Sequence, residues 1–142
     1  MNVLFQIGIG TGLLVCCAVL HITLAAMLVA HLKGKRAIQN LHCQWDVAKL
    51  VLTVFGAFAL SHTIHIYLWA FVVWLAGALS GYEEPFYFVL VTYTTLGYGD
   101  VTLAPAFRIL GAMASVTGIL MFGLTTAFLV SVFARALGAG SA

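Results

Sequence analysis

Residues 94–100 read Thr94-Thr95-Leu96-Gly97-Tyr98-Gly99-Asp100, a short stretch of permissive backbone between two long apolar segments. Lipid cannot satisfy the carbonyl groups of a Gly-X-Gly run, so such a run at membrane depth must be buried in protein or line a watery path. Gly97 and Gly99 can take positive φ angles, which would let successive carbonyl groups turn to one side, and Thr95 adds a hydroxyl. The stretch therefore predicts a ladder of oxygens for cations. The alternative is a tight turn that closes a helical hairpin.

The composition is that of an integral membrane protein. Of the 142 residues, 63% are hydrophobic and 7% are charged, with a mean hydropathy of +1.12, whereas soluble domains are about one-quarter charged. Three segments, at about residues 4–32, 50–79 and 109–134, reach the roughly 20 apolar residues that a spanning helix needs. We predict an all-α membrane protein with three transmembrane helices and a re-entrant segment. The net charge of +2 gives no argument for nucleic-acid binding, and we expect none.

Basic residues indicate the orientation of the chain. With three spans, one side of the membrane holds five of the six Lys and Arg residues: Lys33, Lys35, Arg36, Lys49 and Arg135. That side is the cytoplasm by the positive-inside rule. We therefore predict a multi-pass protein of the cell membrane, with its N-terminus outside and its C-terminus in the cytoplasm. Residues 33–36 could also contact anionic lipid head groups, although topology alone explains them.

The first span is expected to be an accessory helix. It has no positive n-region and is longer than the core of a signal peptide, so we expect it to be retained. It contains no Lys or Arg, whereas a voltage sensor needs several basic residues within the membrane. Gly8, Gly10 and Gly12 would let a neighbouring helix approach closely.

The stretch at 95–100, preceded by Thr92 and Thr94, resembles the selectivity filter of potassium channels. In that family four such loops replace the hydration shell of K⁺ with carbonyl oxygens. The resemblance implies a homotetramer, with K⁺ coordinated by Thr95, Leu96, Gly97, Tyr98 and Gly99 of each copy. The usual second filter residue is Val. Leu96 departs from it, but the carbonyl of this residue would face the ion.

A short helix is expected just before this loop, at about residues 85–94. Glu83 and Glu84 place acids at its positive end, and Pro85 suits its first turn. Such a helix is too short to span the membrane, so it must re-enter, and the resemblance makes it the pore helix. The resemblance also places Tyr87 where its side chain would bond Asp100. We hypothesise that this hydrogen bond braces the filter; ordinary packing of Tyr87 is the alternative.

The last span, about residues 109–134, resembles the inner helix of simple bacterial potassium channels. Gly118 stands where that family has a glycine described as a gating hinge; close helix packing explains it equally well. Helical spacing predicts a cavity and gate face that includes Ser115, Gly118, Ile119, Phe122, Thr126 and Val130, with Phe133 near its end. The hydroxyls would meet hydrated ions, and the large apolar side chains could close the path by dewetting.

Three histidines are expected within the membrane. His62 and His65 are three residues apart and share a helical face, and His21 lies at a comparable depth in the first span. Intramembrane ionisable residues are functional candidates, and imidazoles could bind a divalent metal or sense pH. Neutral histidines that are hydrogen-bonded between helices, beside Ser61 and Thr63, are favoured instead. We expect no cofactor and no metal beyond permeating K⁺.

The sequence thus predicts a K⁺-selective passive channel of the bacterial inner membrane. Residues 1–45 would form the accessory helix and basic linker, and residues 46–142 the pore domain, with the filter at 95–99. After Arg135 we expect no cytoplasmic domain. The alternatives are a weakly selective monovalent cation channel, a pore subunit of a K⁺ uptake system, and a non-conducting scaffold. No catalytic triad, paired carboxylates or phosphate-binding loop indicates an enzyme.

Overall fold

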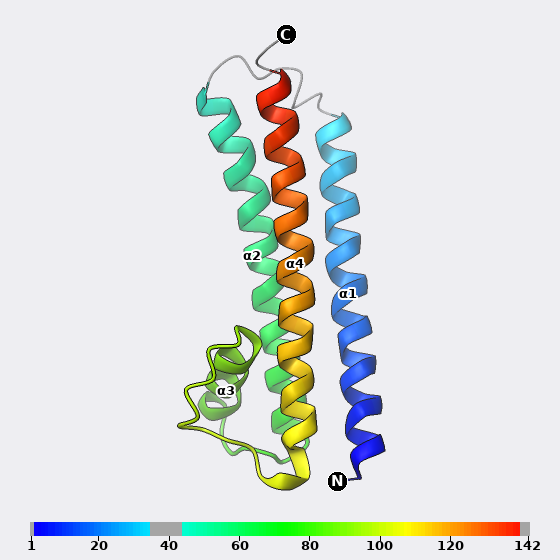
Figure 1. The fold of residues 1–142 in the computed structure, drawn as a ribbon, viewed down its shortest axis with the longest axis vertical. Coiled ribbons are helices and arrows are strands. Elements are labelled where there is room, and N and C mark those ends of the chain that lie inside the picture. Colours follow the sequence, from blue (N-terminus) through cyan, green and yellow to red (C-terminus); the bar gives the residue numbers. More distant parts are fainter. Residues whose placement is uncertain (1, 35–43, 140–142) are drawn as a thin grey trace.

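The computed structural model describes residues 2–34 and 44–139. The helices in these residues are α1 (Val3–Gly34), α2 (Gln44–Leu75), α3 (Glu83–Tyr93), the short 3₁₀ helix η1 (Pro105–Phe107) and α4 (Arg108–Ala139). The three long helices run side by side, and α3 lies against one half of the α2–α4 pair (Figure 1). The prediction of an all-α fold with three membrane-capable helices and a short fourth helix is confirmed.

Three segments are long and apolar enough to cross a membrane: Val3–Leu32, Gln44–Leu75 and Pro105–Ala136. At a rise of about 1.5 Å per residue, each is longer than the roughly 30 Å of hydrocarbon in a bilayer. The start of α1 and α3 lie at the same end of the bundle, and the end of α4 lies at the other end (Figure 1). The loop at 94–100 and the start of α1 therefore lie toward the same end of the bundle.

The helix ends differ from the expected ones. α2 ends at Leu75 instead of near residue 79, because Gly77 takes a φ of 67°. The amide of Ala78 donates to the carbonyl of Val73 at 3.2 Å, and that of Gly77 to Trp74 at 2.9 Å. This is the Schellman arrangement, which ends a helix at a left-handed glycine.

The short helix and the last span are also longer than expected. α3 begins at Glu83 instead of Pro85, so that Pro85 lies within its first turn. There its missing N–H leaves no helical hydrogen bond unmade. α4 continues to Ala139 instead of ending near residue 134, because Ala136 and Leu137, which follow Arg135, are strong helix formers.

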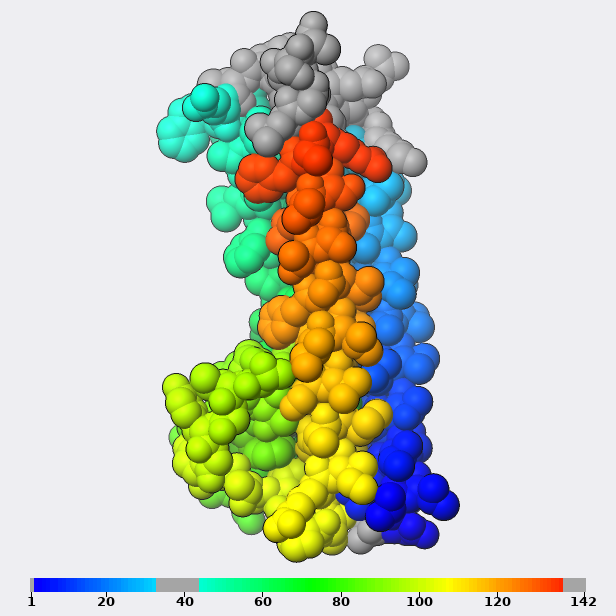
Figure 2. Space-filling view, in the orientation of Figure 1, coloured from blue at the N-terminus to red at the C-terminus, as the bar shows by residue number. Residues whose placement is uncertain are grey.

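The main core lies in the half of the bundle that contains α3. One stripe of α2 is buried at helical spacing and includes Trp69 and Val73, both fully buried. Val89 and Tyr93 of α3 and Leu110 of α4 pack against this stripe. A smaller cluster of Leu50, Val132 and Ala136 closes the other half. Figure 2 shows α3 and its loop projecting from the side of the bundle, below a hollow in the outline. The core therefore fixes α3 firmly while leaving its loop at the surface of the protomer.

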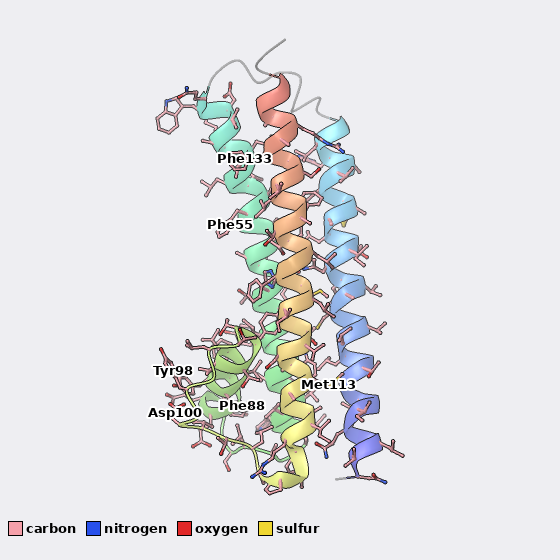
Figure 3. The ribbon with its side chains drawn as sticks, viewed as in Figure 1. Phe55, Phe88, Tyr98, Asp100, Met113 and Phe133 are labelled. Atoms are coloured by element: carbon pink, nitrogen blue, oxygen red, sulfur yellow. The ribbon has the colours of Figure 1, made fainter. Side chains whose placement is uncertain are left out.

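α1 packs against both α4 and α2. A Cβ atom at Gly10 would lie 2.7 Å from Met113 Cγ, so this glycine permits the contact with α4 (Figure 3). Gly8 and Gly12 have no neighbours within 4 Å of such an atom, so the expectation of close approach holds only for Gly10. In addition, Leu110 N donates to Gln6 Oε1 at 3.2 Å, which satisfies one of the free amides at the start of α4.

Candidate functional site

The loop at 94–100, called here the filter loop, alternates in backbone handedness. Thr95, Gly97 and Gly99 have φ angles of 61°, 60° and 80°, whereas Leu96 and Tyr98 between them keep negative φ. A uniform strand points successive carbonyl groups to opposite sides. Alternating left- and right-handed residues cancel this reversal, so the carbonyls share one side and the amides share the other. A positive φ at Thr95 was not expected, because it costs a non-glycine residue about 1–2 kcal/mol.

The amide side of the filter loop faces the end of α3. Leu96 N and Gly97 N both donate to the carbonyl of Val91, at 2.9 and 3.2 Å, and Thr95 N donates to that of Thr92 at 3.0 Å. The last carbonyls of any helix lack hydrogen-bond donors within the helix. Here the amides of the filter loop are the donors to the last carbonyls of α3. The carbonyl side of the loop therefore faces away from α3, and Tyr98 lies on the outer edge of the loop (Figure 3).

Ser115 supports this helix end with a hydrogen bond. Its Oγ donates to the carbonyl of Thr92 at 2.9 Å, and the side chain is half-buried. Its hydroxyl proton is therefore engaged by α3, and the expectation that this hydroxyl meets hydrated ions stays a prediction. Nothing in the local sequence indicates this bond, because Thr92 and Ser115 are 23 residues apart.

The rest of the expected cavity face is exposed in the protomer. Ile119 is 59% exposed, Phe122 39% and Val130 62%, and Thr126 is exposed as well. Thr126 Oγ1 donates to the carbonyl of Phe122 at 2.9 Å, and its oxygen can still accept hydrogen bonds. One side of α4 thus carries an exposed apolar stripe with a hydroxyl, although the ring of Phe122 in this stripe also contacts His62 and Tyr93.

Gly118 is required for packing. A Cβ atom at this position would collide with the carbonyl oxygen of Tyr93, the last residue of α3. α4 is a single continuous helix from Arg108 to Ala139. Gly123, by contrast, has no neighbour within 4 Å of such an atom. The sequence left two interpretations open for Gly118, a gating hinge and close helix packing. The contact with Tyr93 supports close packing.

The hydrogen bond expected between Tyr87 and Asp100 is present. Tyr87 Oη donates to Asp100 Oδ2 at 2.6 Å. The bond stabilises the neutral phenol and the ionised carboxylate, so it raises the pKa of Tyr87 and lowers the pKa of Asp100. It joins the first half of α3 to the far end of the filter loop, which is otherwise exposed.

The three histidines meet in the middle of the bundle. Their ring centroids lie 5.3 Å apart for His21 and His62, 5.6 Å for His21 and His65, and 6.1 Å for His62 and His65. Five of their six ring nitrogens face hydroxyls of Ser61, Thr125 or Tyr93, as donor or acceptor. No group of three or more His, Cys, Asp or Glu side chains within 2–34 and 44–139 could hold a metal ion. The arrangement is that of imidazoles hydrogen-bonded between helices.

Sequence reasoning missed Tyr93 and Thr125 as partners of these histidines. Tyr93 is fully buried and lies against His62 and His65, and Thr125 is 8% exposed. A tyrosine at the end of a helix of apolar residues was one available signal, because a buried phenol hydroxyl needs a hydrogen-bond partner. Thr125 gave no such signal beside Thr126.

The comparisons with known proteins agree with this geometry. A family model described as ion channel matches residues 61–135, which include the second half of α2, α3, the filter loop and most of α4. A segment of 49 residues is 45% identical to the potassium voltage-gated channel protein shk-1 of Caenorhabditis elegans. This segment covers 34% of the chain and 9% of that protein, so the chain matches a small part of that relative's length. No solved structure matches the chain.

Proposed function

The chain belongs to the ion channel family, and on this premise we propose that it conducts K⁺ passively and selectively. It is a multi-pass membrane protein and a channel, not an enzyme. The observation that carries K⁺ selectivity is the filter loop, whose alternating backbone sets a row of carbonyls on the side away from α3. Such rows replace the hydration shell of K⁺.

We propose that four copies form the pore. One loop supplies one wall of a filter, and the residues at 94–100 are exposed in the protomer, with Leu96 at 55% and Tyr98 at 69%. Ile119 and Val130 of α4 are also exposed in the protomer, at 59% and 62%, and Phe122 between them is 39% exposed although its ring stacks on His62. A homotetramer around a four-fold axis accounts for both surfaces, since the loops would face one another above a cavity lined by α4.

In this proposal residues 46–142 form the pore domain and α1 is an accessory helix. The protein lies in the cell membrane, which we take to be the inner membrane of a bacterium. The filter loop and the N-terminus are on the outer side. Figure 1 supports this arrangement because both lie at one end of the bundle. Lys49 near the start of α2 and Arg135 near the end of α4 belong to the opposite end, which the positive-inside rule assigns to the cytoplasm.

The test is a measurement of reversal potential. The purified protein is reconstituted in a planar bilayer with K⁺ on one side and Na⁺ on the other. We expect a large shift toward the K⁺ equilibrium potential. A current that reverses near zero would instead assign a weakly selective cation channel, with Leu96 as the first residue to exchange for Val. An assembled protein without current would contradict passive conduction.

Tyr87→Phe is expected to make the conducting filter less durable, with faster decay of the current during sustained opening. The substitution removes the donor to Asp100 and leaves the carboxylate at the filter end unrestrained. In the wild type the bond persists above the ordinary pKa of an aspartate and is lost as pH falls through the lowered pKa of Asp100. Acidification should therefore reproduce the effect of the substitution.

The matched control is Tyr82→Phe. Tyr82 is 82% exposed, lies at the same end of the bundle, and contacts only the ring of Trp74 among the ring contacts of the described chain. Its hydroxyl has no contact with the filter loop, so current decay should stay as in the wild type. Equal decay in both variants would show that Tyr87 acts by ordinary packing.

A further inference from the structure

A buried series of five hydrogen bonds connects all four main helices; we call it the histidine chain. Its bonds run from Ser61 Oγ to His21 Nδ1 (3.1 Å), His21 Nε2 to Thr125 Oγ1 (3.1 Å), Thr125 Oγ1 to His62 Nε2 (3.0 Å), His62 Nδ1 to Tyr93 Oη (3.0 Å) and Tyr93 Oη to His65 Nδ1 (3.1 Å). No member is more than 9% exposed. The histidine chain thus passes from α1 through α4 and α2 to the last residue of α3.

The bonds of the histidine chain depend on one another. A neutral imidazole has one N–H and one acceptor nitrogen, and a hydroxyl has one proton. When Ser61 donates to His21, His21 must donate to Thr125, and Thr125 to His62. His62 then donates to Tyr93, whose proton goes to His65. The hydroxyl protons of Ser61, Thr125 and Tyr93 are then all donated toward the His65 end of the chain. The tautomer of His21 therefore determines whether Tyr93 accepts a hydrogen bond from His62 or donates one to it.

Tyr93 transmits this arrangement to the filter loop. It is the last residue of α3, and its carbonyl lies directly against Gly118. The carbonyls of the residues just before it hold the filter amides of Thr95, Leu96 and Gly97. The Tyr93 side chain therefore belongs to the helix end on which the filter amides rest.

We propose that His21 and Thr125 are positioning residues for the filter, so that α1 takes part in setting ion selectivity. This inference rests on the proposed function. Removing the Thr125 hydroxyl would leave two imidazole nitrogens unpartnered, in surroundings where neither lipid nor apolar side chains can replace the bonds. The histidines would then re-orient, and Tyr93 would lose its fixed partner.

The test is a double-mutant cycle of His21→Phe and Thr125→Val, with the K⁺/Na⁺ permeability ratio as the readout. Phe keeps the ring that packs on Phe58, at a centroid distance of 4.9 Å, and Val keeps the shape of Thr. We expect each single variant to lower the ratio by about five-fold, which corresponds to one typical net hydrogen bond. Because both act through one chain of bonds, the double variant should be no worse than either single variant.

Thr125→Ser is the matched control, since it keeps the hydroxyl and should keep the wild-type ratio. If Thr125→Val prevents assembly, Thr125→Ala removes the same hydroxyl without a branch and takes its place. Single variants at the wild-type ratio would overturn the inference, and so would a double variant whose loss equals the product of the single losses. A wild-type protein without K⁺ preference would instead refute the proposed function.

Discussion

Gly118→Ala is expected to prevent assembly of a conducting protein. The added methyl group would collide with the carbonyl oxygen of Tyr93 and lie 2.9 Å from its carbonyl carbon. These are backbone atoms and cannot turn aside, so the end of α3 must move away from α4. The bond from Ser115 to Thr92 at 2.9 Å would break with this movement. Overpacking costs about 1–3 kcal/mol or more in each copy, and the filter amides lose their fixed support.

Gly123→Ala is the control, because it makes the same change in the same helix where no atom lies within 4 Å. A helical Gly→Ala change there should stabilise the helix by about 0.5–1 kcal/mol. The measurements are the thermal midpoint of the purified protein, its oligomeric state in detergent, and the current in a bilayer. If Gly118 served only as a hinge, Gly118→Ala would assemble normally and change only the fraction of time open. That result would contradict the packing explanation.

Gly97→Ala is expected to abolish K⁺ selectivity. Gly97 has a φ of 60°, a conformation that costs an L-residue about 1–2 kcal/mol, and a tetramer would bear this strain four times at one level. Relaxing the strain would return Gly97 to negative φ and turn its carbonyl away from the shared side. The amide bond from Gly97 to Val91, at 3.2 Å, would be lost as well.

The matched control for this strain is Gly81→Ala. Gly81 has a φ of 68° and open space around it, as Gly97 does in the protomer, but it precedes α3 and lies outside the filter loop. Both variants should lose thermal stability, while only Gly97→Ala should shift the reversal potential toward zero. Retained selectivity in Gly97→Ala would argue against a carbonyl filter at this loop.

The sequence predicted the three spans and the short helix, and the resemblance to potassium channels led to the hypothesis of a contact between Tyr87 and Asp100. Long apolar runs leave a composition signal, and the Gly-Tyr-Gly loop leaves a motif. The positive φ of Thr95 left no signal, because threonine rarely takes it and only the α3 carbonyls hold it there. The end of α2 could have been predicted from Gly77, which is a helix stop signal.

Contacts between distant elements could not be predicted. The role of Ser115 depends on a carbonyl 23 residues away, and that of Thr125 on a histidine 104 residues away. Helical spacing indicates which residues share a face but not which helix covers that face. For this reason the sequence placed Ser115 with the cavity residues, while the structure places it at the end of α3.

The contacts of α1 also bear on how the protein is made. Gln6 and His21 are synthesised early, but their bonds to Leu110 and Thr125 each span 104 residues of chain. During insertion into the membrane, the two hydrogen bonds from α1 to α4 can therefore form only after the last helix has left the ribosome. Contacts of such long sequence separation form late in folding. A nascent chain that stops short of α4 would lack the bond between Gln6 and Leu110 and the bond between His21 and Thr125, while His21 could already bond Ser61 of α2.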